Sequence, residues 1–163
     1  YMFGENLLVA PVFSDEGDGD YYLPEGIGTH FLTVERVEGG RWVKEKHDFF
    51  SLPLLARPNS IIPVGAVDDL VDYDYAQDVT LHLFELEDGA IASVEVGGDL
   101  RVTAKRDGTQ IMIHYKGAGK PWQLYLRGVF SIAGAEGARA ESAELGLILT
   151  PESYGDGKFV INL

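Results

Sequence analysis

Apolar and polar residues alternate with a period of two along much of the chain. In residues 79–83, Val79, Leu81 and Leu83 would face one way, and Thr80 and His82 would face the other way. Such alternation is typical of strands with one buried face and one face in water. The same pattern recurs in residues 92–96, 111–115, 122–127, 145–149 and 159–163. Each of these segments is therefore predicted to be a strand of an antiparallel sandwich with one wet face per sheet.

Turn-forming residues separate these segments. The sharpest hairpin signal is Asp107-Gly108, because Asp-Gly favours a two-residue turn between strands. The alanine-rich stretch 133–144 is interrupted by Gly134 and Gly137 and has no apolar stripe at helical spacing, so it is predicted to be a loop or a single turn. The fold class predicted is all-β, with little or no helix.

Pro63, Gly65 and the acidic run of residues 68–74 predict a domain boundary near residues 68–76. We expect two antiparallel β-sandwich-like domains in tandem, at residues 1–72 and 73–163. The first block has aromatic-rich strands at residues 21–23, 29–34 and 49–52. A block of this size buries only about 60% of its unfolded surface, so a neighbour is expected to brace it.

The start of the chain points to such a neighbour. Residues 7–10 (LLVA) are continuously apolar, which suits a strand covered on both faces. The strand comes almost at once, without a polar lead-in, so we expect the chain to be the tail of a larger protein. The surface of residues 7–12 and 61–64 is expected to face the missing part.

Charge and composition exclude several classes of function. A net charge of −13 argues against binding to nucleic acids and to anionic membranes. The chain has no cysteine, which excludes disulfides, thiolate zinc sites and a cysteine nucleophile. No apolar run approaches the roughly 20 residues of a membrane span. A protein of a reducing compartment, the cytoplasm, is expected.

Candidate metal sites have simpler explanations. Carboxylates alternate in the loop Asp15 to Asp20, as in a calcium-binding EF-hand loop, but Tyr21 and Ile27 stand where that pattern needs glycine and glutamate. An acidic hairpin tip is the favoured interpretation. The histidines are scattered and lack the spacing of metal ligands: His30, His47, His82 and His114. No metal and no cofactor is therefore predicted.

The candidate catalytic residues also have simpler explanations. His47, Asp48 and Ser51 are triad residue types, but they lie too close along one predicted strand to converge. With 26 acidic residues, chance carboxylate pairs are certain, so their number is no argument for glycoside hydrolysis. Several aromatic residues could stack on sugars, although core packing is the favoured explanation: Tyr21, Tyr22, Trp42, Trp122 and Tyr125.

The segments that predict strands also resemble glycoside hydrolase family 31, and most closely its bacterial α-xylosidases. Residues 1–12 (YMFGENLLVAPV) are similar to the sequence with which these enzymes leave their catalytic barrel. Further similar segments are residues 22–26, 40–43, 51–65, 80–84 and 87–89. One departure is Gly28, where the family usually has tryptophan, which puts the local packing there in doubt.

The resemblance implies a parent enzyme with an (α/β)₈ barrel, an aspartate nucleophile and an aspartate acid/base, and retention of anomeric configuration. The chain looks like the proximal and distal β-domains that follow this barrel. Neither catalytic motif matches a segment here, so no catalytic residue is assigned. The partner implied is the barrel of the parent chain, and oligosaccharide substrate would be met only through the parent.

The function predicted is that of a non-catalytic C-terminal portion of a retaining α-glycosidase, with α-xylosidase preferred over α-glucosidase. The proximal block would brace the barrel, and the distal block would extend the surface, with subunit contacts in a homo-oligomer left open. The alternative is a carbohydrate-binding module with an exposed row of aromatic side chains. A third hypothesis is a self-sufficient enzyme that turns over an aryl α-xyloside.

Overall fold

The computed structural model describes residues 2–3, 7–9, 18–23, 27–31, 36–38, 41–46, 54–65, 79–98, 100–117 and 119–163. The chain forms two compact units, Tyr1–Pro58 and Asn59–Leu163. We call them the N-terminal unit and the C-terminal unit.

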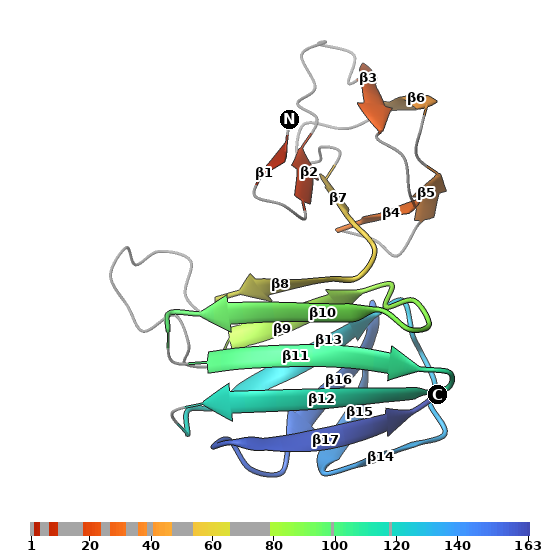
Figure 1. The fold of residues 1–163 in the computed structure, drawn as a ribbon. Helices are drawn as coiled ribbons and strands as arrows, with labels where there is room; N and C mark the ends of the chain where they lie inside the picture. Colours follow the sequence, from red (N-terminus) through yellow and green to blue (C-terminus); the bar gives the residue numbers. More distant parts are fainter. Residues whose placement is uncertain are drawn as a thin grey trace. The chain divides into compact units, whose positions relative to one another are not determined.

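The N-terminal unit contains a five-stranded sheet and a two-stranded sheet (Figure 1). The larger sheet has the strand order β1 (Met2–Phe3), β2 (Leu7–Val9), β7 (Leu54–Ala56), β4 (Ile27–His30) and β5 (Arg36–Glu38). The smaller sheet pairs β3 (Asp18–Leu23) with β6 (Arg41–Lys46). Leu8 and Leu55 are register partners in the centre of the larger sheet, and both side chains are buried. The predicted strands at residues 7–10 and 21–23 are therefore present at residues 7–9 and 18–23, whereas residues 49–52 lie outside the described part.

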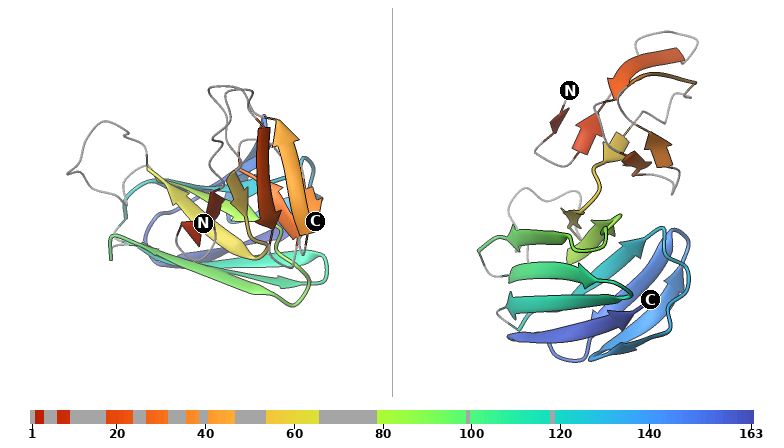
Figure 2. Two further views of the ribbon diagram at one scale, coloured as in Figure 1. Left: turned by 90° about the horizontal axis from the view of Figure 1, so that it is seen from above. Right: turned by 45° about the vertical axis from the view of Figure 1, so that its right-hand side comes forward.

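The C-terminal unit is a sandwich of two five-stranded sheets, seen as two facing layers in Figure 1 and Figure 2. The first sheet has the order β10 (Ile91–Val96), β11 (Leu100–Asp107), β12 (Gln110–Gly117), β17 (Gly157–Asn162) and β14 (Gly134–Glu136). The second sheet has the order β15 (Ala138–Ala143), β16 (Gly146–Pro151), β13 (Trp122–Arg127), β9 (Val79–Phe84) and β8 (Ser60–Val64). All described pairs of neighbouring strands in both sheets are antiparallel except β9 and β13, which are parallel.

Alternate residues of these strands fill one apolar core. On β9, Val79, Leu81 and Leu83 are at most 1% exposed, as the period of two predicted. Full burial of one leucine side chain stabilises the fold by about 1.5–3 kcal/mol. Other core side chains come from strands of both sheets: Val102, Ala104, Ile113, Leu124, Leu149, Phe159 and Ile161.

The hairpin predicted at Asp107-Gly108 is confirmed. Strands β11 and β12 pair without a break, and Asp107 is the register partner of Gln110. Gly108 has a φ of 61°, which a glycine adopts without a steric penalty. Its N–H donates to Asp88 Oδ1 at 2.7 Å, so a second turn holds this one in place.

The prediction of a loop or single turn at residues 133–144 is wrong. This stretch forms β14 in one sheet and β15 in the other. Gly137, with a φ of 87°, lies between them, and a Cβ there would meet Phe159 Cβ at 3.1 Å. The chain thus crosses between the two sheets at a glycine that no larger residue could replace without strain.

The predicted domain boundary at residues 72 and 73 stays a prediction, because residues 66–78 lie outside the described part. The two compact units divide earlier, between Pro58 and Asn59. The reason is that β8 pairs with β9 along five residues and so completes a sheet of the C-terminal unit.

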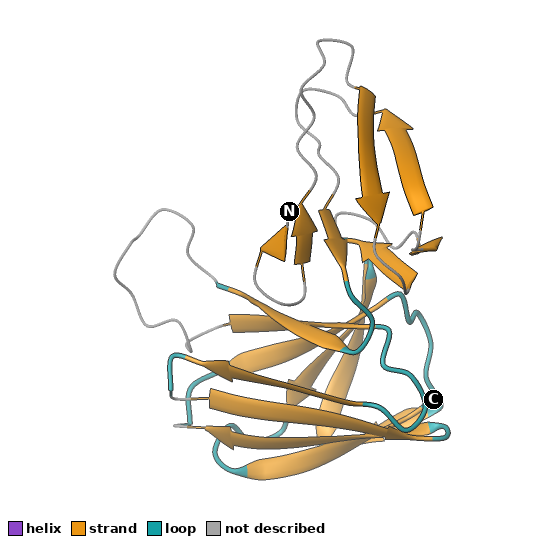
Figure 3. Ribbon diagram, turned by 45° about the horizontal axis from the view of Figure 1, so that its top comes forward, coloured by secondary structure: helices purple, strands orange, loops and turns teal. Residues whose placement is uncertain are grey.

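The described residues contain strands, turns and loops but no helix (Figure 3). Consistent with this, no described segment is a helix that could cross a membrane. The predicted all-β class is confirmed.

Gly146→Ala should destabilise the fold by about 2–4 kcal/mol. Gly146 is the register partner of Arg127, and a Cβ built on it would overlap the carbonyl oxygen of Leu126. Chemical denaturation followed by tryptophan fluorescence measures the effect. The matched control is Gly155→Ala, because a Cβ at Gly155 meets nothing within 4 Å. Equal stability of the two variants would contradict this account of β16.

Candidate functional site

The structure places only some of the metal candidates. Asp18 and Asp20 lie on β3, His82 lies on β9 and His114 lies on β12, whereas His47 lies outside the described residues. Within the described ranges, no group of three or more His, Asp or Glu side chains could hold a metal ion. Residues 15–17 of the acidic loop lie outside the described part, so the expectation for this loop stays a prediction.

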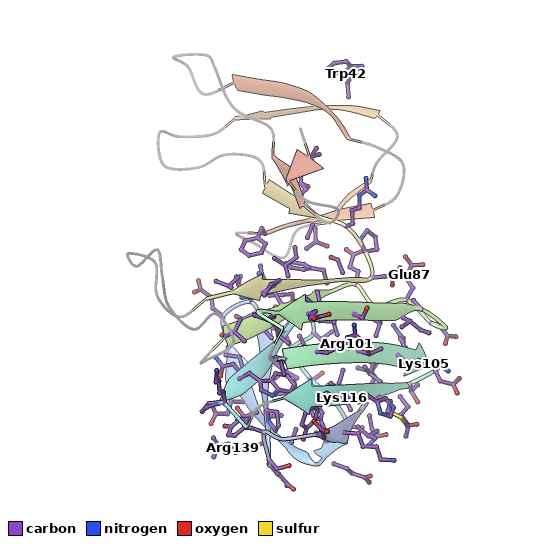
Figure 4. All side chains as sticks on the ribbon, turned by 60° about the vertical axis from the view of Figure 1, so that its left-hand side comes forward. Trp42, Glu87, Arg101, Lys105, Lys116 and Arg139 are labelled. Atoms are coloured by element: carbon purple, nitrogen blue, oxygen red, sulfur yellow. The ribbon has the colours of Figure 1, made fainter. Side chains whose placement is uncertain are left out.

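Of the five aromatic candidates, Tyr22 and Trp42 are register partners in the N-terminal unit, whereas Trp122 and Tyr125 belong to the C-terminal unit. Trp122 is 2% exposed in the sandwich core and packs edge-on against Tyr115, with ring centroids 5.2 Å apart. Trp42 lies on β6 of the N-terminal unit, is 73% exposed and projects away from its strand (Figure 4). Tyr21 and Tyr22 lie on β3. The core explanation is thus confirmed for Trp122, whereas Trp42 is exposed.

A group of polar and aromatic side chains lies on the outer face of the second sheet of the C-terminal unit. It consists of His82 and Phe84 from β9 and Tyr125 and Arg127 from β13, and we call it the arginine cluster. The parallel register pairs His82 with Tyr125 and Phe84 with Arg127, which brings the four side chains onto one face. The alternating residues of both strands face the core on the other side.

The cluster is built around the guanidinium group of Arg127. Its Cζ lies 4.9 Å from the centroid of the Phe84 ring and 5.5 Å from that of Tyr125. Its Nη1 donates to Nδ1 of His82 at 3.1 Å, since arginine has no acceptor. The His82 ring also stacks on Tyr125, with centroids 5.1 Å apart. The guanidinium therefore contacts three rings at once.

Two further hydrogen bonds tie the cluster to neighbouring strands. The Tyr125 hydroxyl accepts from the N–H of Leu145 at 2.8 Å, in the connection between β15 and β16. Gln123 Nε2 donates to Thr80 Oγ1 at 3.1 Å, and this register pair lies two residues before the pair of Tyr125 and His82 on the same face. The outer face of these two strands is thus held by polar contacts, while the inner face is held by the core.

Burial and charge both keep His82 neutral. Desolvation, with a smaller contribution from the positive charge of Arg127, lowers the pKa of His82 from 6.5 to about 4. Desolvation also lowers the pKa of Arg127 from its ordinary value. Because Nδ1 accepts from Arg127, the neutral imidazole carries its proton on Nε2.

This arrangement is poorly suited to acid–base catalysis. A general base works best with a pKa near the operating pH, and His82 lies well below that range. Its acceptor nitrogen is already occupied by Arg127. The contacts of the cluster fix strands β9 and β13 against each other, which is a structural task.

The sequence pattern did not predict this cluster. Alternation along residues 122–127 predicted Tyr125 and Arg127 on a wet face, yet they are only 8% and 5% exposed. The prediction fails because the guanidinium lies over two rings, so that its neighbours shield it from water. The signal available in the sequence was aromatic residues and one arginine at alternate positions of two strands, but their parallel pairing was not predictable.

Replacing His82 with glutamine should reduce the dependence of stability on pH. Between about pH 6.5 and pH 4 the unfolded chain binds a proton at His82 that the folded chain does not bind, so unfolding becomes easier as the pH falls. The free energy of unfolding should drop from pH 7 to pH 4.5 by about 2 kcal/mol less in His82→Gln than in the wild type. Urea denaturation at a series of pH values measures this.

The matched control is His114→Gln, which alters an exposed histidine of the first sheet. A wild-type pH dependence in His82→Gln would contradict the assignment of His82 as the buried neutral partner of Arg127.

Comparison with solved structures shows the fold. The chain superposes on a GH31 dextranase from Flavobacterium johnsoniae with a TM-score of 0.81 and 19% identity, covering 98% of this chain and 26% of that one. A GH31 alpha-xylosidase from Xanthomonas citri matches with a TM-score of 0.57 and 24% identity, over 78% of this chain and 16% of that one. These enzymes share the architecture of tandem β-rich units.

Comparison with characterised proteins identifies closer relatives. The chain is 44% identical to alpha-xylosidase XylQ of Lactiplantibacillus pentosus over 98 residues, which are 57% of this chain and 13% of the relative. It is 49% identical to an alpha-xylosidase of Emericella nidulans over 73 residues, which are 40% of this chain and 9% of the relative. The chain therefore corresponds to a small part of the length of these proteins.

Two family models divide the chain between them. The model described as glycosyl hydrolase family 31 C-terminal domain matches residues 1–62. The model described as alpha-xylosidase YicI, C-terminal domain matches residues 74–163. The chain belongs to glycosyl hydrolase family 31, of which it carries these two C-terminal domains.

Proposed function

We propose that this chain is a non-catalytic C-terminal portion of a retaining α-glycosidase, with α-xylosidase as the preferred activity of the whole enzyme. The observation that carries this proposal is the tandem match of two C-terminal-domain models to residues 1–62 and 74–163. Identities of 44% and 49% to alpha-xylosidases favour that activity over an α-glucosidase. Bond cleavage belongs to the catalytic barrel that the family resemblance implies.

The proposed task of the chain is mechanical. The N-terminal unit would brace the barrel, and the C-terminal unit would extend the surface of the enzyme. The contacts of the arginine cluster support a structural task for the C-terminal unit, because they join β9 and β13 and leave His82 with its acceptor nitrogen occupied.

The barrel-facing surface needs one correction. Ile61 was expected on it, but its side chain is 2% exposed and packs in the core of the sandwich. The alternating residues Ile62 and Val64 of β8 are half-buried on the opposite face and remain candidates. The side chain of Leu8 on β2 is also buried within this chain, and residues 10–12 lie outside the described part.

The carbohydrate-binding alternative rests on Trp42, because an exposed indole can stack on a sugar ring. Such modules present two or three aromatic side chains in a row. The other large aromatic residue that is exposed among the described side chains is Phe130, which is 53% exposed and belongs to the other unit. Within the N-terminal unit, Tyr22 is the register partner of Trp42, so these two positions on β3 and β6 are the ones that this alternative would use.

We expect the purified chain to show no turnover of aryl α-xylosides or aryl α-glucosides above the blank. The reason is that both catalytic carboxylates are expected in the barrel, and the purified chain does not include the barrel. Release of the aryl group, measured by absorbance over hours at high protein concentration, tests this. Turnover that survives repeated purification would overturn the proposal.

Calorimetric titration with xyloglucan oligosaccharides separates the two functions. No heat is expected for a bracing portion. Saturable heat that is lost in Trp42→Ala would instead establish the carbohydrate-binding alternative.

Hydrogen exchange should show weaker protection of β2 and β7 than of β13 and β16 in the 163-residue chain. A bracing unit without its barrel lacks part of the apolar cover that resists local opening. Mass spectrometry of exchanged peptides can compare the segments around Leu8 and Leu55 with those around Leu124 and Leu149. Equal protection of the two sets of strands would contradict the bracing role.

A further inference from the structure

Strand β15 (Ala138–Ala143) is an edge strand with a free side. It is the last strand of its sheet, and no described strand pairs with it on the side away from β16. All six of its residues pair with β16 in one continuous register, so it contains no bulge. Four successive side chains, at residues 139–142, are exposed. An edge of this kind offers unpaired backbone N–H and C=O groups to another strand.

The other edges of the sandwich are protected by different means. Strand β8 carries Pro63, which cannot donate to a further strand. Strand β14 has only three residues, and β10 lies in contact with β8. Strand β15 has no proline, and its charged residues are Arg139 and Glu141. These two therefore decide what β15 accepts.

Arg139 and Glu141 lie two residues apart and so share the outer face of the sheet. Their side chains are 73% and 60% exposed, and Arg139 Nε lies 3.6 Å from Glu141 Oε1. Charges on an edge strand usually oppose pairing with another chain. Two charges of opposite sign that lie two residues apart instead favour pairing when the strand meets a copy of itself in antiparallel orientation.

The symmetric register follows from the sequence. If a two-fold axis passes beside Ala140, Arg139 of each copy lies opposite Glu141 of the other copy, so one contact contains two opposite-charge pairs. An axis beside Arg139 or beside Glu141 would place like charges opposite each other, which is destabilising. The charge pattern thus selects one register.

The remaining side chains leave room for a second backbone. Residues 138, 140 and 143 are alanine and residue 142 is serine. Ala140 and Ser142 are exposed although they alternate with the outer-face residues. A second strand can therefore approach to the usual spacing of about 4.8 Å without displacing a large side chain.

We propose that β15 is a self-complementary edge at which two copies of this chain join their sheets, with Arg139 of each copy paired to Glu141 of the other. The contact is short, so it falls in the class of small and transient interfaces. We expect a dissociation constant on the order of 100 µM for the wild-type chain. This inference does not depend on the proposed function.

Charge reversal tests the register. Arg139→Glu and Glu141→Arg each place like charges opposite one another in a homodimer, so each variant should self-associate at least about tenfold more weakly than the wild type. A mixture of the two variants restores both opposite-charge pairs between unlike chains, and it should associate as the wild type does. The double variant R139E/E141R should also recover self-association.

Sedimentation velocity from about 10 to 500 µM chain measures these equilibria around the expected dissociation constant. Thermal unfolding of each variant checks that the fold is kept. The matched control for Arg139→Glu is Lys105→Glu, which makes the same change of charge on β11 of the other sheet. Figure 4 labels both Arg139 and Lys105. The control should associate as the wild type does.

Three results would overturn the proposal. One is a wild-type chain that stays monomeric throughout the concentration range. Another is association that neither single reversal weakens, which would locate the contact on a different surface. The third is a mixture of the two single variants that associates no better than either variant alone.

Discussion

The C-terminal unit depends on the burial of alternate side chains between its two sheets. Leu81 and Leu83 of β9, Leu124 of β13 and Leu149 of β16 are completely or almost completely buried, and they face Val102, Ile113 and Phe159 of the other sheet across one core. Several such residues, at about 1.5–3 kcal/mol each, outweigh any single polar contact in the unit. Strand register follows from this burial, because a slip by one residue would turn these side chains to the outer face.

The outer face of the second sheet carries a second and more specific restraint. The parallel pairing of β9 with β13 aligns His82 with Tyr125 and Phe84 with Arg127. A buried guanidinium is costly unless its neighbours compensate for lost water, and here two rings and the His82 nitrogen offset part of that cost. The same contacts leave His82 neutral, so the cluster stabilises the sheet and does not resemble a catalytic centre. A structural role of the cluster agrees with the match of this chain to two C-terminal-domain models of family 31.

The sequence predicted the strands whose two faces differ in polarity. Residues 79–83, 111–115 and the Asp107-Gly108 hairpin were found correctly because alternate burial and turn chemistry are local signals. Strands β14 and β15 were missed, since an edge strand of Ala, Arg, Glu and Ser buries little on either face and resembles a loop. The burial of Arg127 was also missed, because it depends on a parallel neighbour 45 residues away in sequence, His82. Long-range pairing of this kind leaves no periodic trace in one chain.

We propose that this chain is part of a larger enzyme whose barrel performs the chemistry, because it matches only 13% and 9% of the length of its alpha-xylosidase relatives. The most direct measurement is the sequence of the coding DNA immediately upstream of the codon for Tyr1, read in the same frame. We expect an open frame that encodes an (α/β)₈ barrel with paired aspartate motifs of family 31. A stop codon directly upstream of a start signal for this chain, or an unrelated domain in that position, would contradict the claim.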